Sequence, residues 1–126
     1  MSSWYLESAN HTSGPYPPDQ NEFELAGLTA LPSEVVKPPR VAESAVQFEC
    51  EVVDIQPRLN DDGIHTVSVV TARVVRFHVH EEVLTEESAG KLNKPVVDWA
   101  KLQPVGRLGG DIYTVVQNGI DIPRPR

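Results

Sequence analysis

The stretch Ala45-Val-Gln-Phe-Glu-Cys-Glu-Val-Val-Asp-Ile55 decides the fold class, because its side chains alternate between apolar and polar. The apolar positions are Val46, Phe48, Cys50 and Val52, and the polar positions are Gln47, Glu49 and Glu51. A period of two residues is typical of a β-strand with one covered face. The phase changes at Val53, which predicts a β-bulge near Val52 and Val53. The same pattern predicts that Cys50 is a small buried hydrophobic residue.

A second strand is expected from about Thr66 to His80, with a bend near Thr71 and Ala72. Its last positions place Val75, Phe77 and Val79 on one face and Arg76, His78 and His80 on the other. Asn60-Asp-Asp-Gly63 lies between the two segments and has the composition of a turn. The sequence therefore predicts an antiparallel hairpin.

Helices are expected to be few and short. Trp4 to Ala9 has the character of a helix end, within a segment 1–20 that is otherwise irregular. A helix from about Gln20 to Ala26 is expected, with Asp19 at its start and Gly27 as a left-handed C-cap.

The end of the chain is expected to hold a helical turn around Asp98 to Lys101 and a last strand from Tyr113 to Gln117. Gly106, Gly109 and Gly110 are expected to interrupt regular structure between them. Strands outnumber helices without alternating with them, so the fold class is all-β with minor α, an antiparallel barrel or sandwich. We expect one domain over residues 1–126, with its β core at 45–117.

The composition and charge of the chain limit the kinds of partner that it is expected to bind. The 126 residues carry 18 acidic and 11 basic side chains and a net charge of −7, which argues against nucleic acid or an anionic membrane surface as the main partner. The single cysteine excludes an intrachain disulfide. No stretch reaches the roughly 18 apolar residues of a membrane span, and no signal peptide is evident, so a cytoplasmic protein is expected.

Two groups of residues are candidates for chemistry. The row Arg76, His78 and His80 has three interpretations: a water-facing polar face, a metal site completed by His65 or Glu81, or a row facing an anion or a flavin. Gly109 and Gly110 allow either a tight turn or close approach of the backbone to a flat ligand. Tyr113 can stack on a planar ring or fill the core.

Several blocks in order resemble the flavin reductase-like family of FMN-binding split barrels. They are Ala9-Asn-His-Thr-Ser-Gly-Pro-Tyr-Pro-Pro18, Asn21-Glu-Phe-Glu-Leu-Ala-Gly-Leu-Thr29, Val36-Lys-Pro-Pro-Arg-Val-Ala-Glu-Ser44, Phe48-Glu-Cys50, Val74-Val-Arg-Phe-His-Val-His80 and Pro104 to Tyr113. The chain is similar to the subgroup of flavoredoxin and the reductase components of two-component monooxygenases. The resemblance matches the C-terminal two-thirds of such a domain, so an N-terminally truncated split β-barrel is expected.

The resemblance implies FMN, with FAD as the alternative, and NAD(P)H as hydride donor. It also implies a homodimer and a monooxygenase partner. By position, the cofactor-binding residues it implies are Thr12, Ser13, Lys37, Arg40, His78, His80, Gly109, Gly110 and Tyr113. His80 matches the histidine near the isoalloxazine better than His78 does.

Two other functions stay open from the sequence. One is a truncated, non-catalytic β module that binds a partner, or binds flavin only weakly. The other is a small metal-dependent barrel that uses His78 and His80.

Overall fold

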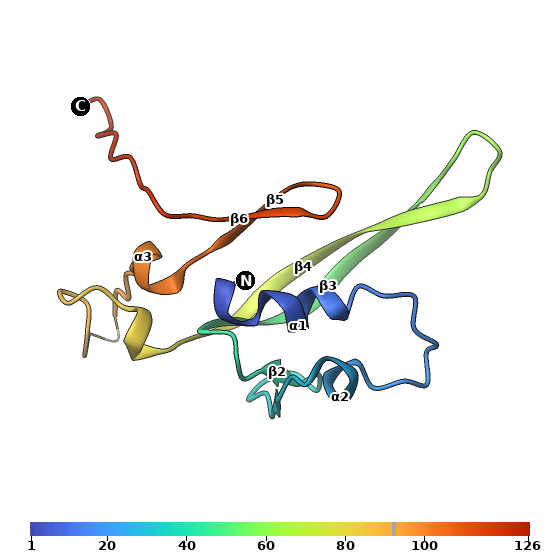
Figure 1. Cartoon of the computed structure of the whole chain (residues 1–126), viewed down its shortest axis with the longest axis horizontal. Helices are drawn as coiled ribbons and strands as arrows, with labels where there is room; N and C mark the ends of the chain where they lie inside the picture. Colours follow the sequence, from blue (N-terminus) through green and yellow to red (C-terminus); the bar gives the residue numbers. More distant parts are fainter. Residues whose placement is uncertain (92) are drawn as a thin grey trace.

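The computed structural model describes residues 1–91 and 93–126, and its main element is a long antiparallel ribbon (Figure 1). The ribbon pairs β3 (Val46–Leu59) with β4 (His65–Val79). The turn between them is held by the Asn60 side chain, whose Oδ1 accepts hydrogen bonds from the amides of Asp62 and Ile64. The predicted hairpin is confirmed, although β3 runs four residues beyond Ile55.

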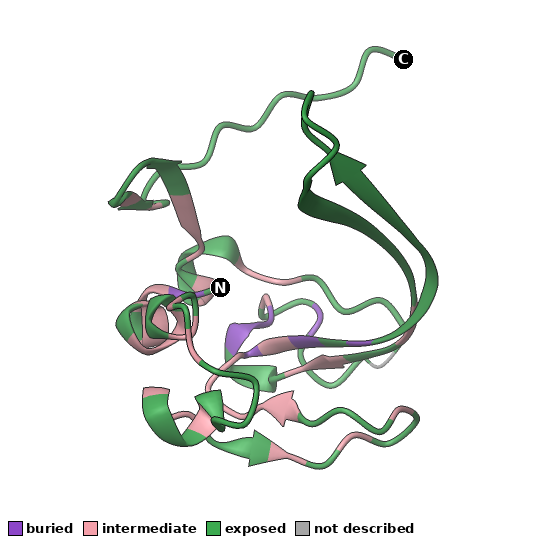
Figure 2. Ribbon diagram, turned by 90° about the vertical axis from the view of Figure 1, so that its right-hand side faces the viewer, coloured by how far each residue is buried: buried purple, intermediate pink, exposed green. Residues whose placement is uncertain are grey.

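The ribbon is curved rather than flat, because its register shifts three times (Figure 2). One shift falls between Val52 and Asp54, opposite Ala72 and Thr71, so the bulge and the bend predicted from the sequence coincide. An unpaired residue on one strand increases local twist and bends the pair. The other two shifts lie between Glu49 and Cys50 and between Arg58 and Leu59.

Two smaller antiparallel pairs accompany the ribbon. The first joins β1 (Ala30–Leu31) to β2 (Arg40–Val41), and the second joins β5 (Val105–Gly109) to β6 (Ile112–Val115). Gly109 and Gly110 have φ of 112° and 53°, which favour glycine. Gly109 ends β5, and Gly110 lies in the tight turn that leads into β6. The expectation that the glycines interrupt regular structure is wrong for Gly106 and Gly109, which belong to β5, and is confirmed for Gly110.

The helices are short, as expected. They are η1 (Ser3–Tyr5), α1 (Leu6–His11), α2 (Glu22–Ala26), η2 (Glu81–Val83) and α3 (Trp99–Leu102). Gly27 is the left-handed C-cap of α2, as predicted, but Asn21 rather than Asp19 caps its start by accepting from the Phe23 amide. Among the described residues, no helix is long and apolar enough to cross a membrane.

The covered face of β3 is the polar one, which reverses the prediction. Gln47 and Glu49 are buried, whereas Phe48 between them is 55% exposed. Cys50 is also exposed, so the prediction of a buried thiol is wrong. The reason is that the segment 30–44 hydrogen-bonds to Gln47 and Glu49 and covers their side of the ribbon.

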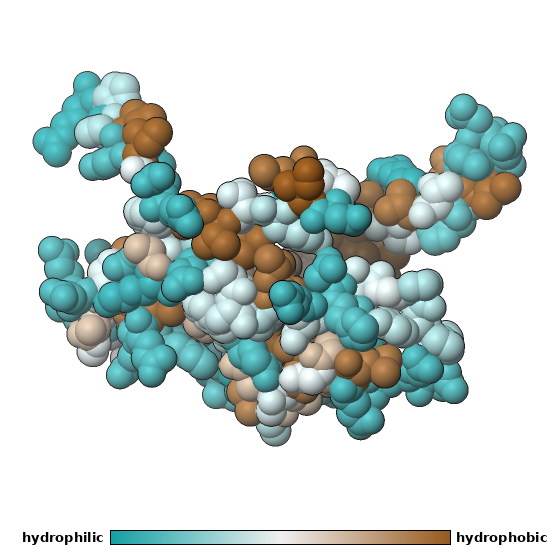
Figure 3. All heavy atoms as spheres, in the orientation of Figure 1, coloured by the Kyte–Doolittle hydropathy of each residue, from teal (hydrophilic) through white to brown (hydrophobic). Residues whose placement is uncertain are grey.

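The opposite face carries uncovered apolar side chains. Phe48 and Phe77 are cross-strand partners whose rings meet edge to face, with centroids 5.0 Å apart, and Phe77 is 63% exposed. Further exposed apolar residues lie along both faces of the ribbon, since neighbours such as Val69 and Val70 alternate, and they are Val52, Val53, Ile55, Val67, Val69 and Val70. Figure 3 shows hydrophobic side chains at the surface along the ribbon and at its tip. An exposed aromatic pair such as Phe48 and Phe77 is typical of an interaction face.

We expect the chain to self-associate through the Phe48 and Phe77 face. Burying each of these side chains contributes about 1.5–3 kcal/mol. The double substitution Phe48→Ser and Phe77→Ser should therefore lower the mean mass measured by light scattering. Leu108→Ser is the matched control, because Leu108 is 67% exposed but lies on β5. A wild-type chain that stays monomeric at high concentration would contradict this expectation.

Candidate functional site

The candidate site is built around the carboxylate of Glu49, which is almost fully buried on β3. Its Oε1 accepts hydrogen bonds from the Glu34 amide at 2.9 Å and from His78 Nε2 at 2.6 Å. Its Oε2 accepts from the amides of Val35 and Val36 at 2.7 and 3.1 Å. Three successive amides and one imidazole therefore converge on a single side chain, which joins the loop 33–38 to both strands of the ribbon.

These contacts keep Glu49 ionised. Burial by itself raises the pKa of the Glu49 carboxyl, because the charged form loses its hydration. The hydrogen bonds from the Glu34 amide and His78, with those of the two following amides, act in the opposite direction and lower the pKa to about 2. Glu49 is thus a buried anion that acts only as an acceptor.

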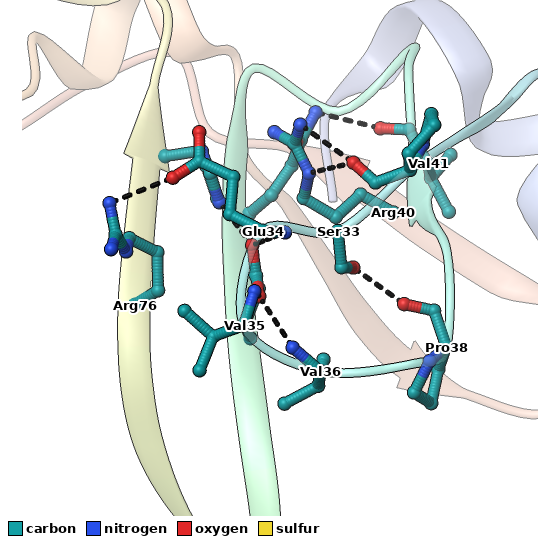
Figure 4. A network of polar contacts seen from close by, with 12 residues as sticks. Ser33, Glu34, Val35, Val36, Pro38, Arg40, Val41 and Arg76 are labelled. Atoms are coloured by element: carbon teal, nitrogen blue, oxygen red, sulfur yellow. Dashed lines mark hydrogen bonds and ion pairs between the residues drawn. The ribbon is translucent and has the colours of Figure 1, made fainter.

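The loop 33–38 is tied down by further polar contacts (Figure 4). The Ser33 hydroxyl donates to the carbonyl of Pro38 at 2.5 Å and closes the loop on itself. The Glu34 carboxylate pairs with the Arg76 guanidinium on β4 at 2.8 Å. Because both partners of this pair are about half exposed, it contributes little by itself. The buried Glu49 contacts hold the loop.

Arg40 follows the loop and is fixed in the same network (Figure 4). Its guanidinium donates to the Pro32 carbonyl through Nε and NH2, and to Gln47 Oε1 at 2.8 Å. Gln47 in turn donates to the carbonyls of Val41 and Ser44. Since Gln47 is buried, Arg40 is anchored to the ribbon and does not swing freely in solvent.

A groove of about 770 Å³ runs along the end of β4 beside this network. Its lining combines basic and apolar side chains: Arg40, Val75, Arg76, Phe77, His78, Val79, His80, Glu81, Leu84, Ser88, Gly90, Lys91 and Pro95. Three of the nine cofactor-binding residues expected from the sequence, Arg40, His78 and His80, meet here. Lys37 lies exposed on the loop 33–38 and is not part of the lining.

A second cavity, of about 330 Å³, lies between α1 and the β5–β6 hairpin. Its lining residues are Met1, Ala9, Asn10, Ser13, Val105, Arg107, Asp111 and Tyr113. The Tyr113 hydroxyl donates to Asn10 Oδ1 at 2.7 Å, and the Arg107 guanidinium carbon lies 5.9 Å from the centre of the Tyr113 ring. Ser13 and Tyr113 therefore share a cavity, but one that has no lining residue in common with the groove.

The remaining predicted residues have local structural contacts. The Thr12 hydroxyl donates to the Ala9 carbonyl, and the Ser13 hydroxyl donates to the Asn10 carbonyl. Both hydroxyls therefore satisfy carbonyls at the C-terminal end of α1. Gly110 accepts from the Arg107 guanidinium in the turn of the second hairpin. The structure thus places three of the nine residues in the groove and two in the second cavity, and the other four line neither.

Sequence reasoning missed Glu49, Arg107 and Lys91. Glu49 was assigned to the polar face of β3, and alternation alone does not say which face is covered. Its membership in the block Phe48-Glu-Cys50 was the available signal. For the metal interpretation, the described residues contain no group of three His, Cys, Asp or Glu side chains that could hold an ion. His78 already uses Nε2 to bind Glu49.

Comparison with known proteins identifies relatives over most of the chain. A family model described as a flavin reductase like domain matches residues 1–101. An uncharacterized protein of Halalkalibacterium halodurans is 33% identical over 120 residues, which cover 95% of this chain and 54% of that protein. The chain therefore spans about half the length of this relative.

Solved structures agree with the fold. Nitrilotriacetate monooxygenase component B from Bacillus cereus superposes with a TM-score of 0.83 and 28% identity, covering 97% of this chain and 56% of that one. A protein with a split barrel domain from Shewanella frigidimarina superposes with a TM-score of 0.77 at 21% identity, covering 99% and 58%. The all-β split-barrel prediction is confirmed.

Stability should fall in acid because of Glu49. Its pKa is about 2 in the folded chain and 4.5 in its ordinary state, so between these values only the unfolded state binds a proton. The contribution of Glu49 to the free energy of unfolding should be constant above about pH 5. It should decrease as the pH falls from 4.5 toward 2. Urea unfolding at a series of pH values measures this slope.

Glu49→Gln removes the titrating group and should flatten that part of the profile while destabilising the chain at neutral pH. Glu51→Gln is the matched control, since Glu51 also pairs across the ribbon but is half exposed. If Glu49→Gln and wild type show the same slope, the Glu49 carboxylate does not supply the acid sensitivity.

Proposed function

The chain belongs to the flavin reductase-like domain family, and from this premise we propose that it is a flavin-binding protein whose groove along β4 holds part of the flavin. In the complete domain it would support NAD(P)H-dependent flavin reduction. The flavin would supply the redox chemistry, and the protein would supply binding and electrostatics. The observation that carries the proposal is the meeting of Arg40, His78 and His80 on one groove.

The groove suits a planar, partly anionic ligand. Arg40 and Lys91 provide positive charge, and the imidazoles of His78 and His80 provide polar nitrogen atoms. Val75, Val79 and Leu84 add apolar surface for a ring system. A few polar groups on a mainly apolar wall are the usual composition of a cofactor site.

A second function is favoured by a different observation. The uncovered Phe48 and Phe77 face, together with a chain about half as long as its relative, fits a β module that is incomplete as a flavin site. Such a module would bind flavin weakly, or would bind a partner through the apolar face. Cys50 lies two residues after Phe48 on β3 and is exposed, so its thiol reports whether this face is covered.

The finer features of the proposal come from the resemblance. We propose FMN rather than FAD as the cofactor, a homodimer as the assembly, and the cytoplasm as the location. A monooxygenase partner is proposed from the similarity to a protein named as component B of nitrilotriacetate monooxygenase.

We expect the 126-residue chain to bind FMN weakly, and a chimera to bind it tightly. The chimera joins this chain to the part of the Halalkalibacterium halodurans relative that it does not match. Each missing charge-assisted hydrogen bond costs about 1.5–3 kcal/mol, so the loss of two weakens binding by roughly a hundredfold or more. Fluorescence titration with FMN measures both affinities. Submicromolar binding by the chain alone would show that the groove needs no further strands.

In the chimera, Arg40→Ala should weaken FMN binding by about tenfold or more, because one charge-assisted contact is lost. Arg58→Ala is the matched control, since Arg58 is on the distal part of β3 and hydrogen-bonds to Gln56. We expect His80→Ala and Tyr113→Ala to weaken binding as well. An unchanged affinity for Tyr113→Ala would remove the second cavity from the flavin site.

A further inference from the structure

We propose that Glu49 is a positioning residue of the groove: it fixes the tautomer of His78, so that Nδ1 is offered to a ligand as a hydrogen-bond acceptor, and it holds the loop 33–38 beside that ring. The ligand chemistry follows: a group that donates a hydrogen bond, such as an N–H or a hydroxyl. This inference rests on the proposed function only in taking the groove as the binding site.

The tautomer follows from the chemistry of the contact. Glu49 Oε1 lies 2.6 Å from His78 Nε2, and the pKa of Glu49 is lowered to about 2. An ionised carboxylate has no proton to donate, so Nε2 must carry the hydrogen. In a neutral imidazole the other nitrogen is then an acceptor with a free lone pair. The carboxylate of Glu49 thus determines which ring nitrogen of His78 remains a hydrogen-bond acceptor for a ligand in the groove.

The geometry leaves Nδ1 available. The His78 side chain is 15% exposed and lines the groove, whereas Glu49 itself is fully buried. Among residues 1–91 and 93–126, the hydrogen bonds of His78 involve Nε2 alone. With Nε2 bound to Glu49, Nδ1 is the one polar atom that the ring can offer to a ligand in the groove.

The same carboxylate places the neighbouring charge. Loop 33–38 is suspended on Glu49 through three amides and leads directly into Arg40, which lines the groove. Arg40 is bound to Gln47, and Gln47 is the cross-strand partner of His78. Glu49 therefore fixes an acceptor nitrogen and a cation on one wall without touching the ligand. A ligand that donates to Nδ1 and offers an acceptor to Arg40 satisfies both.

The test is NMR spectroscopy of the full 126-residue chain with ¹⁵N-labelled histidine. Long-range proton–nitrogen correlations distinguish the two tautomers, and His78→Gln assigns the His78 signals among the four histidines. Measured on the alkaline side of any histidine titration seen in the same spectra, wild type should show the Nε2–H tautomer alone. Glu49→Gln should show a mixture, because one amide oxygen replaces two carboxylate oxygens that accept four hydrogen bonds.

Glu51→Gln is the control and should retain the wild-type spectrum, since Glu51 pairs with Arg73 and does not contact His78. Amide exchange at Glu34, Val35 and Val36 gives a second readout: protection in wild type and Glu51→Gln, and at least tenfold faster exchange in Glu49→Gln. An Nδ1–H tautomer in wild type, or identical spectra and exchange in Glu49→Gln and wild type, would overturn the proposal.

Addition of FMN separates this inference from the proposed function. A shift of the His78 Nδ1 signal on titration supports acceptance of a ligand hydrogen bond. If the tautomer and the loop protection are as expected but FMN changes no histidine signal, the flavin proposal fails and the positioning role of Glu49 stands. If FMN binds and His78 carries its hydrogen on Nδ1, the positioning role of Glu49 fails and the flavin proposal stands.

Discussion

The buried carboxylate of Glu49 holds the loop 33–38 and His78 against the ribbon. Glu49 accepts four hydrogen bonds, three from consecutive amides of the loop 33–38 and one from His78. An ion taken out of water is costly unless its lone pairs are all occupied, and here the protein occupies them with groups that themselves need an acceptor. The loop has few other bonds to the ribbon, so its path depends on this anion. Removing the charge would leave three amides and one imidazole competing for fewer acceptors.

The same interaction explains which side of the ribbon is covered. Polar side chains of β3 face the loop and the β1–β2 pair, and the aromatic pair Phe48 and Phe77 is left on the outer face. Phe48 and Phe77 are more than half exposed, and covering them would be favourable. Related proteins about twice as long have additional chain, and a second copy is the other candidate to cover it. The same additional chain that would cover this face is the chain that the proposed flavin site would gain in the complete domain.

Much of the local structure could be predicted from the sequence. The Asn60–Gly63 turn and the Gly27 cap follow from residue types with a strong backbone preference, and the bulge at Val53 follows from the change of phase in the alternation. The covered face could not be predicted, because alternation defines two faces and only tertiary contacts select one. Cys50 was misassigned for this reason. The residues of the candidate groove could be predicted in part. The resemblance indicated Arg40, His78 and His80, but it could not show that Thr12, Ser13 and Tyr113 lie away from this groove.

The position of the loop 33–38 and the tautomer of His78 both depend on Glu49 remaining an ion inside the folded chain. The most direct measurement is the pH titration of its side-chain carboxyl carbon by NMR. We predict that the carboxyl of Glu49 titrates with a pKa of about 2, well below its ordinary value of 4.5. A Glu49 signal that titrates near 4.5 would contradict this prediction, because a carboxylate with an ordinary pKa is not holding the loop and His78.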